Sequence, residues 1–187
     1  DQALTLDFSG GDVKKVLLND SAVEFDYNNW FITIAQKNLN IGPQHLAIEF
    51  THPYSKTGSG LYRSIDPEDG KAYIYSDLEP YDANQIFPAF DQPDLKATYE
   101  MQVEVPADWH VVSARRESEI VDKGERKTWN FPISDKFSTY IFSLHAGPYK
   151  VWEAMAGDIP LRLMARQTLA EYVNEEDWFE ISQQGFE

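Results

Sequence analysis

Hydrophobic and polar residues alternate along most of this chain, in short runs separated by turn sequences. Because neighbouring side chains of a strand point to opposite faces of a sheet, this alternation predicts half-buried β-strands. The expected strands are residues 4–8, 13–18, 23–27, 30–34, 46–51, 73–79, 96–105, 110–114, 127–131, 139–146, 149–154 and 161–165. Short strands at this spacing predict a mainly β domain, built as an antiparallel, sandwich-like sheet.

The strand expected at residues 73–79 carries two carboxylates at its end. Asp77 and Glu79 share one face by the period of two, and Pro80 ends the strand because proline cannot donate to the ladder. The following loop has no regular period, although residues 82–86 could form one helical turn. Paired acids at a strand end form a candidate site for a cationic group. A pair that is simply solvated is the alternative.

The tail of the chain changes character and predicts a helix. Asn174 can cap it, and the three acidic residues that follow suit its first turn, where the helix dipole favours negative charge. Trp178, Ile181 and Phe186 would form its apolar stripe. Because the pattern is cut off at Glu187, we expect this helix to begin a further domain.

Composition narrows the partners that such a domain could bind. The 187 residues suffice for one domain with its own core. The net charge of −15 and the isoelectric point of about 4.5 disfavour nucleic acid and anionic membranes. A cationic ligand, such as a peptide amino terminus, would be attracted, although the acidity could equally serve solubility alone. No apolar run approaches the roughly 20 residues of a membrane-spanning helix, so no membrane segment is expected.

Residue types that carry covalent or metal chemistry are sparse. The chain has no cysteine, which excludes disulfides and thiolate metal sites and leaves the cellular compartment undecided. The four histidines, His45, His52, His110 and His145, occur in no H-E-x-x-H motif and form no pair at helical spacing. No metal site is therefore expected within this chain. Nucleophile-elbow, P-loop and dinucleotide-binding motifs are also missing.

Three segments of the chain resemble a known family. They are G-L-Y-R-S at 60–64, Y-S-D-L-E-P at 75–80 and F-P-A-F-D-Q-P-D-L-K-A-T-Y at 87–99. Together they resemble the N-terminal domain of the M1 family of zinc aminopeptidases, of the aminopeptidase N type. Residues 129–131 and 138–149 follow the same pattern, so the resemblance covers most of the chain.

The resemblance implies roles for the two carboxylates. It implies a saddle-shaped, mostly antiparallel β domain in which Glu79 binds the free α-ammonium of a peptide substrate. Asp77 stands where the family has a glutamine that helps shape the first side-chain pocket, and a second acid there could favour basic N-terminal residues. The family pattern also leads us to expect a cis bond between Glu79 and Pro80. Asn84 and Ala89 replace a family arginine and cysteine and are expected to be structural.

The resemblance also implies a division of the chain. Residues 1–170 would be the β-rich N-terminal domain, without its first strands, and residues 171–187 would lead by a helix into an absent catalytic domain. The parent protein would be a zinc-dependent hydrolase whose zinc lies in that catalytic domain, with no cofactor in this fragment. The expected partners are the amino terminus of a peptide substrate and the parent's own catalytic domain. The fragment alone is not expected to be catalytic.

Two other interpretations of the sequence remain open at this point. A free-standing β-sandwich could bind a ligand such as a carbohydrate on its tryptophan and tyrosine faces. A purely structural domain would leave its acids solvated. An H-E-x-x-H motif encoded after Glu187 would favour the aminopeptidase over both alternatives.

Overall fold

The computed structural model describes residues 2–186. Asp1 and Glu187, where the tail pattern is cut off, lie outside the described residues. The strands are β1 (Leu4–Asp7), β2 (Asp12–Leu18), β3 (Ser21–Ala22), β4 (Asp26–Tyr27), β5 (Phe31–Ile34), β6 (Leu46–Thr51), β7 (Gly60–Ile65), β8 (Ala72–Asp77), β9 (Met101–Pro106), β10 (His110–Ser113), β11 (Glu119–Asp122), β12 (Arg126–Phe131), β13 (Leu144–Gly147), β14 (Lys150–Ala156) and β15 (Ile159–Ala165). The helices are the 3₁₀ turns η1 (Gln36–Asn38), η2 (Ala83–Gln85), η3 (Thr139–Ile141) and η4 (Gln167–Tyr172) and the α-helix α1 (Glu175–Gln184).

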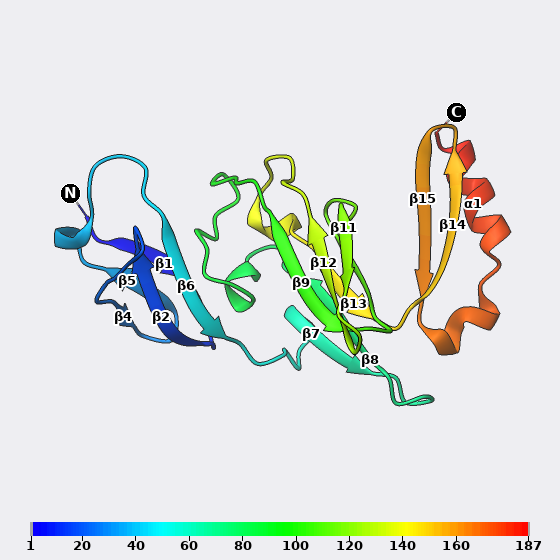
Figure 1. The fold of residues 1–187 in the computed structure, drawn as a ribbon, viewed down its shortest axis with the longest axis horizontal. Coiled ribbons are helices and arrows are strands. Elements are labelled where there is room, and N and C mark those ends of the chain that lie inside the picture. Colours follow the sequence, from blue (N-terminus) through cyan, green and yellow to red (C-terminus); the bar gives the residue numbers. More distant parts are fainter. Residues whose placement is uncertain (1, 187) are drawn as a thin grey trace.

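The strands form three successive blocks along the molecule (Figure 1). The N-terminal block contains the sheets β1-β5-β4 and β3-β2-β6, and the central block contains β10-β13-β8-β7 and β11-β12-β9. The C-terminal block is the hairpin β14–β15 with α1 beside it. Every pairing between these strands is antiparallel, which confirms the predicted fold class.

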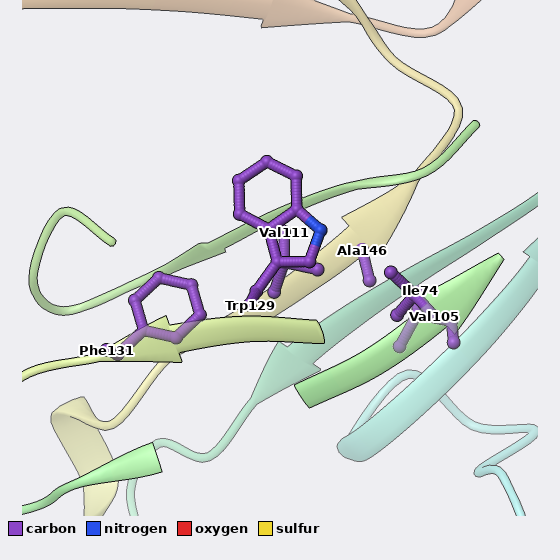
Figure 2. Packing of buried hydrophobic residues seen from close by; sticks show 6 residues of the cluster. All are labelled: Ile74, Val105, Val111, Trp129, Phe131 and Ala146. Atoms are coloured by element: carbon purple, nitrogen blue, oxygen red, sulfur yellow. The ribbon is translucent and has the colours of Figure 1, made fainter. Parts of the chain in front are cut away.

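The first two blocks each have a core of their own. In the N-terminal block, Phe8, Val16, Ile32 and Ile34 are buried between the two sheets. In the central block, Ile74, Val111 and Ala146 of one sheet meet Val105, Trp129 and Phe131 of the other (Figure 2). Inward-facing apolar residues from two sheets give the layered packing of a β-sandwich.

The alternating pattern predicted most strands correctly. It was wrong in segments whose backbone or side chains form hydrogen bonds to loops that are distant in the sequence. The strand at 46–51 is confirmed, whereas the one expected at 96–105 begins only at Met101. The run at 139–146 begins instead as η3, because the hydroxyl of Ser138 donates to the carbonyl of Pro93 and that of Thr139 to Asp91. These tertiary contacts override the β propensity of the sequence.

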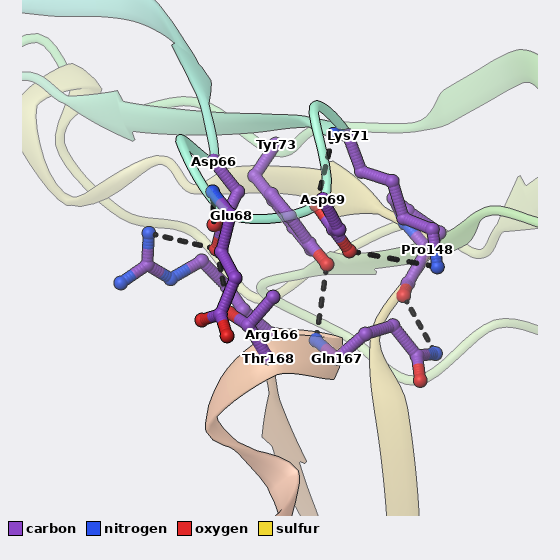
Figure 3. Close-up of polar contacts among 9 residues, drawn as sticks. All are labelled: Asp66, Glu68, Asp69, Lys71, Tyr73, Pro148, Arg166, Gln167 and Thr168. Atoms are coloured by element: carbon purple, nitrogen blue, oxygen red, sulfur yellow. Dashed lines mark hydrogen bonds and ion pairs between the residues drawn. The ribbon is translucent and has the colours of Figure 1, made fainter.

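Polar contacts attach the C-terminal block to the central one (Figure 3). The buried carboxylate of Asp66 lies 3.3 Å from the Arg166 guanidinium and accepts a 2.7 Å hydrogen bond from the Thr168 hydroxyl. The backbone N–H of Gln167 donates to the hydroxyl of Tyr73 over 3.0 Å. We call Asp66, Arg166, Gln167 and Thr168 the tail contact.

The α-helix forms where the tail pattern predicts one. Asn174 is the residue before the first turn, as predicted, yet its side chain makes no capping hydrogen bond. Trp178, Ile181 and Phe186, the residues of the predicted apolar stripe, are exposed. The opposite side of the helix lies on β14, where the Gln183 amide donates to a backbone carbonyl of that strand. No helix between residues 2 and 186 has the length and apolarity needed to cross a bilayer.

The packing predicts a strong contrast between two isoleucines of the N-terminal block. Ile32 is fully buried and Ile41 is fully exposed. Ile32→Ala should lower the free energy of unfolding by about 2–5 kcal/mol through lost burial and a residual cavity, whereas Ile41→Ala should change it by less than about 0.5 kcal/mol. Urea denaturation followed by tryptophan fluorescence measures both values. Equal effects would contradict this assignment of the core.

The tail contact predicts a pH dependence of stability. The backbone N–H of Glu68, then the Thr168 hydroxyl and Arg166, hold the pKa of Asp66 below its usual range. The stabilisation is therefore complete above the ordinary carboxyl pKa of about 4 and is lost as the pH falls through the lowered value.

In the variant Asp66→Asn, the drop in unfolding free energy between pH 6 and pH 3 should be smaller than in the native chain. Denaturant titrations at the two pH values measure this difference. Asp108→Asn, at an exposed position, is the matched control and should leave the pH dependence unchanged. An Asp66→Asn variant with the native pH dependence would contradict the role of the tail contact.

Candidate functional site

The two predicted site residues flank the end of a central strand. β8 ends at Asp77, two residues earlier than the sequence suggested, so Glu79 lies in the turn that follows. Between them Leu78 is buried, with 2% of its surface exposed, while both carboxylate residues are exposed. The bond between Glu79 and Pro80 is cis, as expected. The structure thus places both acids on the surface, on either side of one buried anchor.

Both carboxylates are left without a basic partner. None of the ion pairs within residues 2–186 includes Asp77 or Glu79. Gly60 is the residue opposite Asp77 on β7, and its backbone has a φ of 72°, which a residue with a Cβ rarely adopts. A Cβ at this position would also approach the side chain of Gln85 to 3.0 Å. Since glycine has no side chain, the neighbouring strand does not cover Asp77.

Half-buried aromatic rings extend from the acids along the same face of the sheet. Tyr75 precedes Asp77 by two residues and pairs with Tyr62 on β7. The ring of His145 on β13 lies 6.2 Å from that of Tyr75 in an edge-to-face arrangement. Burial lowers the pKa of His145 and raises that of Tyr75, so both rings are neutral at pH 7. The surface next to the acids therefore includes neutral aromatic rings.

Apolar packing holds the turn from below. Leu78 packs with Ala83 of η2 and Phe142 in a small core of its own. The backbone N–H of Asp82 donates to the carbonyl of Leu78 over 3.0 Å, which closes the turn around Glu79. This packing and this bond fix the start of an otherwise irregular loop.

A buried polar network fixes the end of that loop. The Asp91 carboxylate is 1% exposed and accepts hydrogen bonds of 2.9 Å from both the backbone and the side-chain N–H of Asn84. It also accepts one of 2.5 Å from the Thr139 hydroxyl. Ala89 forms a two-way backbone bridge with Asp7 of β1. Asn84 and Ala89 thus have the structural contacts that the sequence led us to expect.

The sequence did not identify a pair of residues that links this loop to the N-terminal block. The hydroxyl of Tyr81 donates to Oδ1 of Asp7 over 2.8 Å, and the backbone N–H of Asp91 donates to Oδ2 over 3.0 Å. Burial and the hydrogen bond to Asp7 raise the pKa of Tyr81 to about 12. Asp7 lies within the run 4–8 and belongs to no local motif, so no signal in the sequence marked it.

The described residues do not provide a metal site. Within residues 2–186 no three histidine, aspartate or glutamate side chains come together in a group that could hold a metal ion. Asp77 and Glu79 alone supply fewer protein ligands than the three of a catalytic zinc site. What this arrangement can do chemically is offer charge-assisted hydrogen bonds to a cation.

Comparison with known proteins identifies related sequences and a solved structure with the same fold. The family model for the peptidase M1 N-terminal domain matches residues 5–141. Aminopeptidase N of Streptomyces lividans is 34% identical over 186 residues, which cover 97% of this chain and 21% of that protein. Probable M1 family aminopeptidase 1 of Encephalitozoon cuniculi is 34% identical over 128 residues, which cover 65% of this chain and 14% of that protein. The chain thus spans about a fifth or less of the length of these relatives.

A solved structure has the same fold. The crystal structure of Legionella pneumophila aminopeptidase A in complex with aspartic acid superposes with a TM-score of 0.79 at 16% identity. The match covers 93% of this chain and 21% of that one. Both the family model and this structure extend across β8 and the turn that bears Glu79.

Proposed function

The chain belongs to the peptidase M1 N-terminal domain family, and from this premise we propose that it supplies the substrate amine anchor of an aminopeptidase. Glu79 is the anchor. One observation carries the proposal: in the turn that follows β8, the carboxylate of Glu79 is exposed and has no basic partner among residues 2–186. A peptide α-ammonium would supply the missing positive charge through a charge-assisted hydrogen bond.

Anchoring the amine explains how an enzyme would release one residue at a time. A fixed distance from Glu79 to the reacting groups would allow only the first peptide bond of the substrate to reach them. In this proposal those groups, with the zinc, would lie in a catalytic domain elsewhere in the parent protein. This domain would thus contribute to substrate binding and not to bond cleavage.

Asp77 would place a negative charge in the pocket that binds the side chain of the substrate's first residue. It is exposed and not covered by Gly60 opposite it, and the aromatic rings of Tyr75 and Tyr62 continue the surface. Carboxylates and aromatic faces both attract long cationic side chains. We therefore expect the parent enzyme to prefer lysine or arginine at the amino terminus of its substrates.

The anchor is tested in the full-length aminopeptidase that carries this domain. Glu79→Gln keeps the size of the side chain but removes its charge. Because a hydrogen bond to a charged group contributes about 1.5–3 kcal/mol, kcat/KM for aminoacyl p-nitroanilides should fall roughly 10- to 100-fold. Glu125→Gln, an exposed change in the β11–β12 turn, is the matched control and should have the native value. Unchanged kinetics in Glu79→Gln would refute the anchor.

The negative charge of Asp77 in this pocket predicts that its removal changes the substrate preference. Asp77→Asn should lower kcat/KM for arginyl and lysyl substrates roughly tenfold while leaving leucyl and alanyl substrates near their native values, because only the former carry a partner charge. The ratio of the two kcat/KM values is the measurement. Asp158→Asn, in the exposed β14–β15 turn, serves as the charge control. An equal loss for all substrates would contradict a role in side-chain selection.

A further inference from the structure

Asp7 forms hydrogen bonds to the loop after β8 with both its side chain and its backbone. Its Oδ1 accepts from the Tyr81 hydroxyl at 2.8 Å and its Oδ2 from the backbone N–H of Asp91 at 3.0 Å. Its own backbone N–H donates to the carbonyl of Ala89, and its carbonyl accepts from the N–H of Ala89, at 2.8 and 3.0 Å. One residue at the end of β1 thus holds the loop at three positions, 81, 89 and 91.

The first of these positions lies two residues from the proposed amine anchor. Pro80, which separates Tyr81 from Glu79, has a ring that locks its backbone φ, so little freedom remains between the two residues. On the other side of Glu79, Leu78 is buried and its carbonyl accepts the hydrogen bond from Asp82. Glu79 is therefore held between an apolar anchor on one side and the bond from Tyr81 to Asp7 on the other.

We propose that Asp7 and Tyr81 are positioning residues for Glu79, acting through Pro80. The N-terminal block then has a function at the site, since one of its carboxylates sets the direction in which the Glu79 side chain leaves the turn. This inference rests on the proposed function of Glu79. Neither Asp7 nor Tyr81 needs to touch the substrate.

The chemistry of the hydrogen bond from Tyr81 to Asp7 allows it to support the turn permanently. With its pKa raised to about 12, the Tyr81 hydroxyl stays protonated and remains a donor at every pH near neutrality. The acceptor is a carboxylate, and hydrogen bonds to charged acceptors are shorter and stronger than neutral ones. Tyr81 is 48% exposed, so removal of its hydroxyl leaves the surrounding packing in place.

The test uses the full-length aminopeptidase and Tyr81→Phe, which removes the hydroxyl and keeps the ring. We expect KM for free-amine p-nitroanilide substrates to rise roughly three- to tenfold with kcat changed less than about twofold, because the anchor is displaced and the reacting groups are not. The inhibition constant of an analogue without the amino group should stay at its native value. Tyr54→Phe removes a hydroxyl at a position of similar exposure, 45%, and should match the native enzyme.

A double-mutant cycle separates positioning from general stability. If Tyr81 acts through Glu79, Tyr81→Phe should have little further effect on KM once Glu79→Gln is present. Additive effects of the two changes, or a native KM in Tyr81→Phe, would overturn the inference while leaving the anchor intact. A native KM in Glu79→Gln alone would overturn the proposed function and this inference with it.

Asp7→Asn provides the second variant, for use should Tyr81→Phe fail to fold. It keeps the shape of the side chain and removes the charge that strengthens both of its hydrogen bonds. KM should rise in the same direction as in Tyr81→Phe, with the same independence from the analogue that lacks an amine. An Asp7→Asn enzyme with native KM would overturn the inference.

Discussion

The hydrogen bonds to the buried carboxylate of Asp91 are the constraint on which the site depends. Between β8 and β9 the only regular element is the 3₁₀ turn η2, and backbone β-pairing with other segments is limited to isolated bridges at Ala89 and Ala97. Asp91 accepts from Asn84 twice and from Thr139 once, and this ties the loop to itself and to η3. A buried carboxylate without such donors would be costly, so the loop conformation and its hydrogen bonds require each other. This network fixes η2, which begins four residues after Glu79.

Most of the fold was predictable because its strands bury one face and expose the other. The period of two located β6 and β8 and most of β2, and the tail pattern located α1. It failed at η3, where Ser138 and Thr139 bond to residues 45 and 48 positions away. A local pattern contains no information on such partners. For α1 the period located an apolar stripe, but a period shows only that a face is apolar and not which part of a protein covers it.

The residues of the candidate site also divide into those that local sequence patterns identify and those that they do not. Asp77 and Glu79 were found from sequence, since strand period, proline and family pattern coincide within eight residues, from Tyr73 to Pro80. Tyr81 and Asp7 were not, because they are 74 positions apart and each is unremarkable alone. Residues that could contact a ligand lie in one segment, whereas residues that support them come from another block. Only three-dimensional structure brings the second group into view.

Through its hydrogen bonds to Asp7, the loop after β8 connects the central block to the separately packed N-terminal block. The N-terminal core is centred on Phe8 and Ile32, and the core of the central sandwich is centred on Val111 and Trp129. Since these interiors share no residue, a slight rotation of one block against the other would leave both of them intact. The same rotation would be transmitted to the turn through the hydrogen bond between Tyr81 and Asp7, and the angle of Glu79 would change first. Under the proposed function, the stiffness of this junction, and not the stability of either core, would set how precisely a bound amine is aligned.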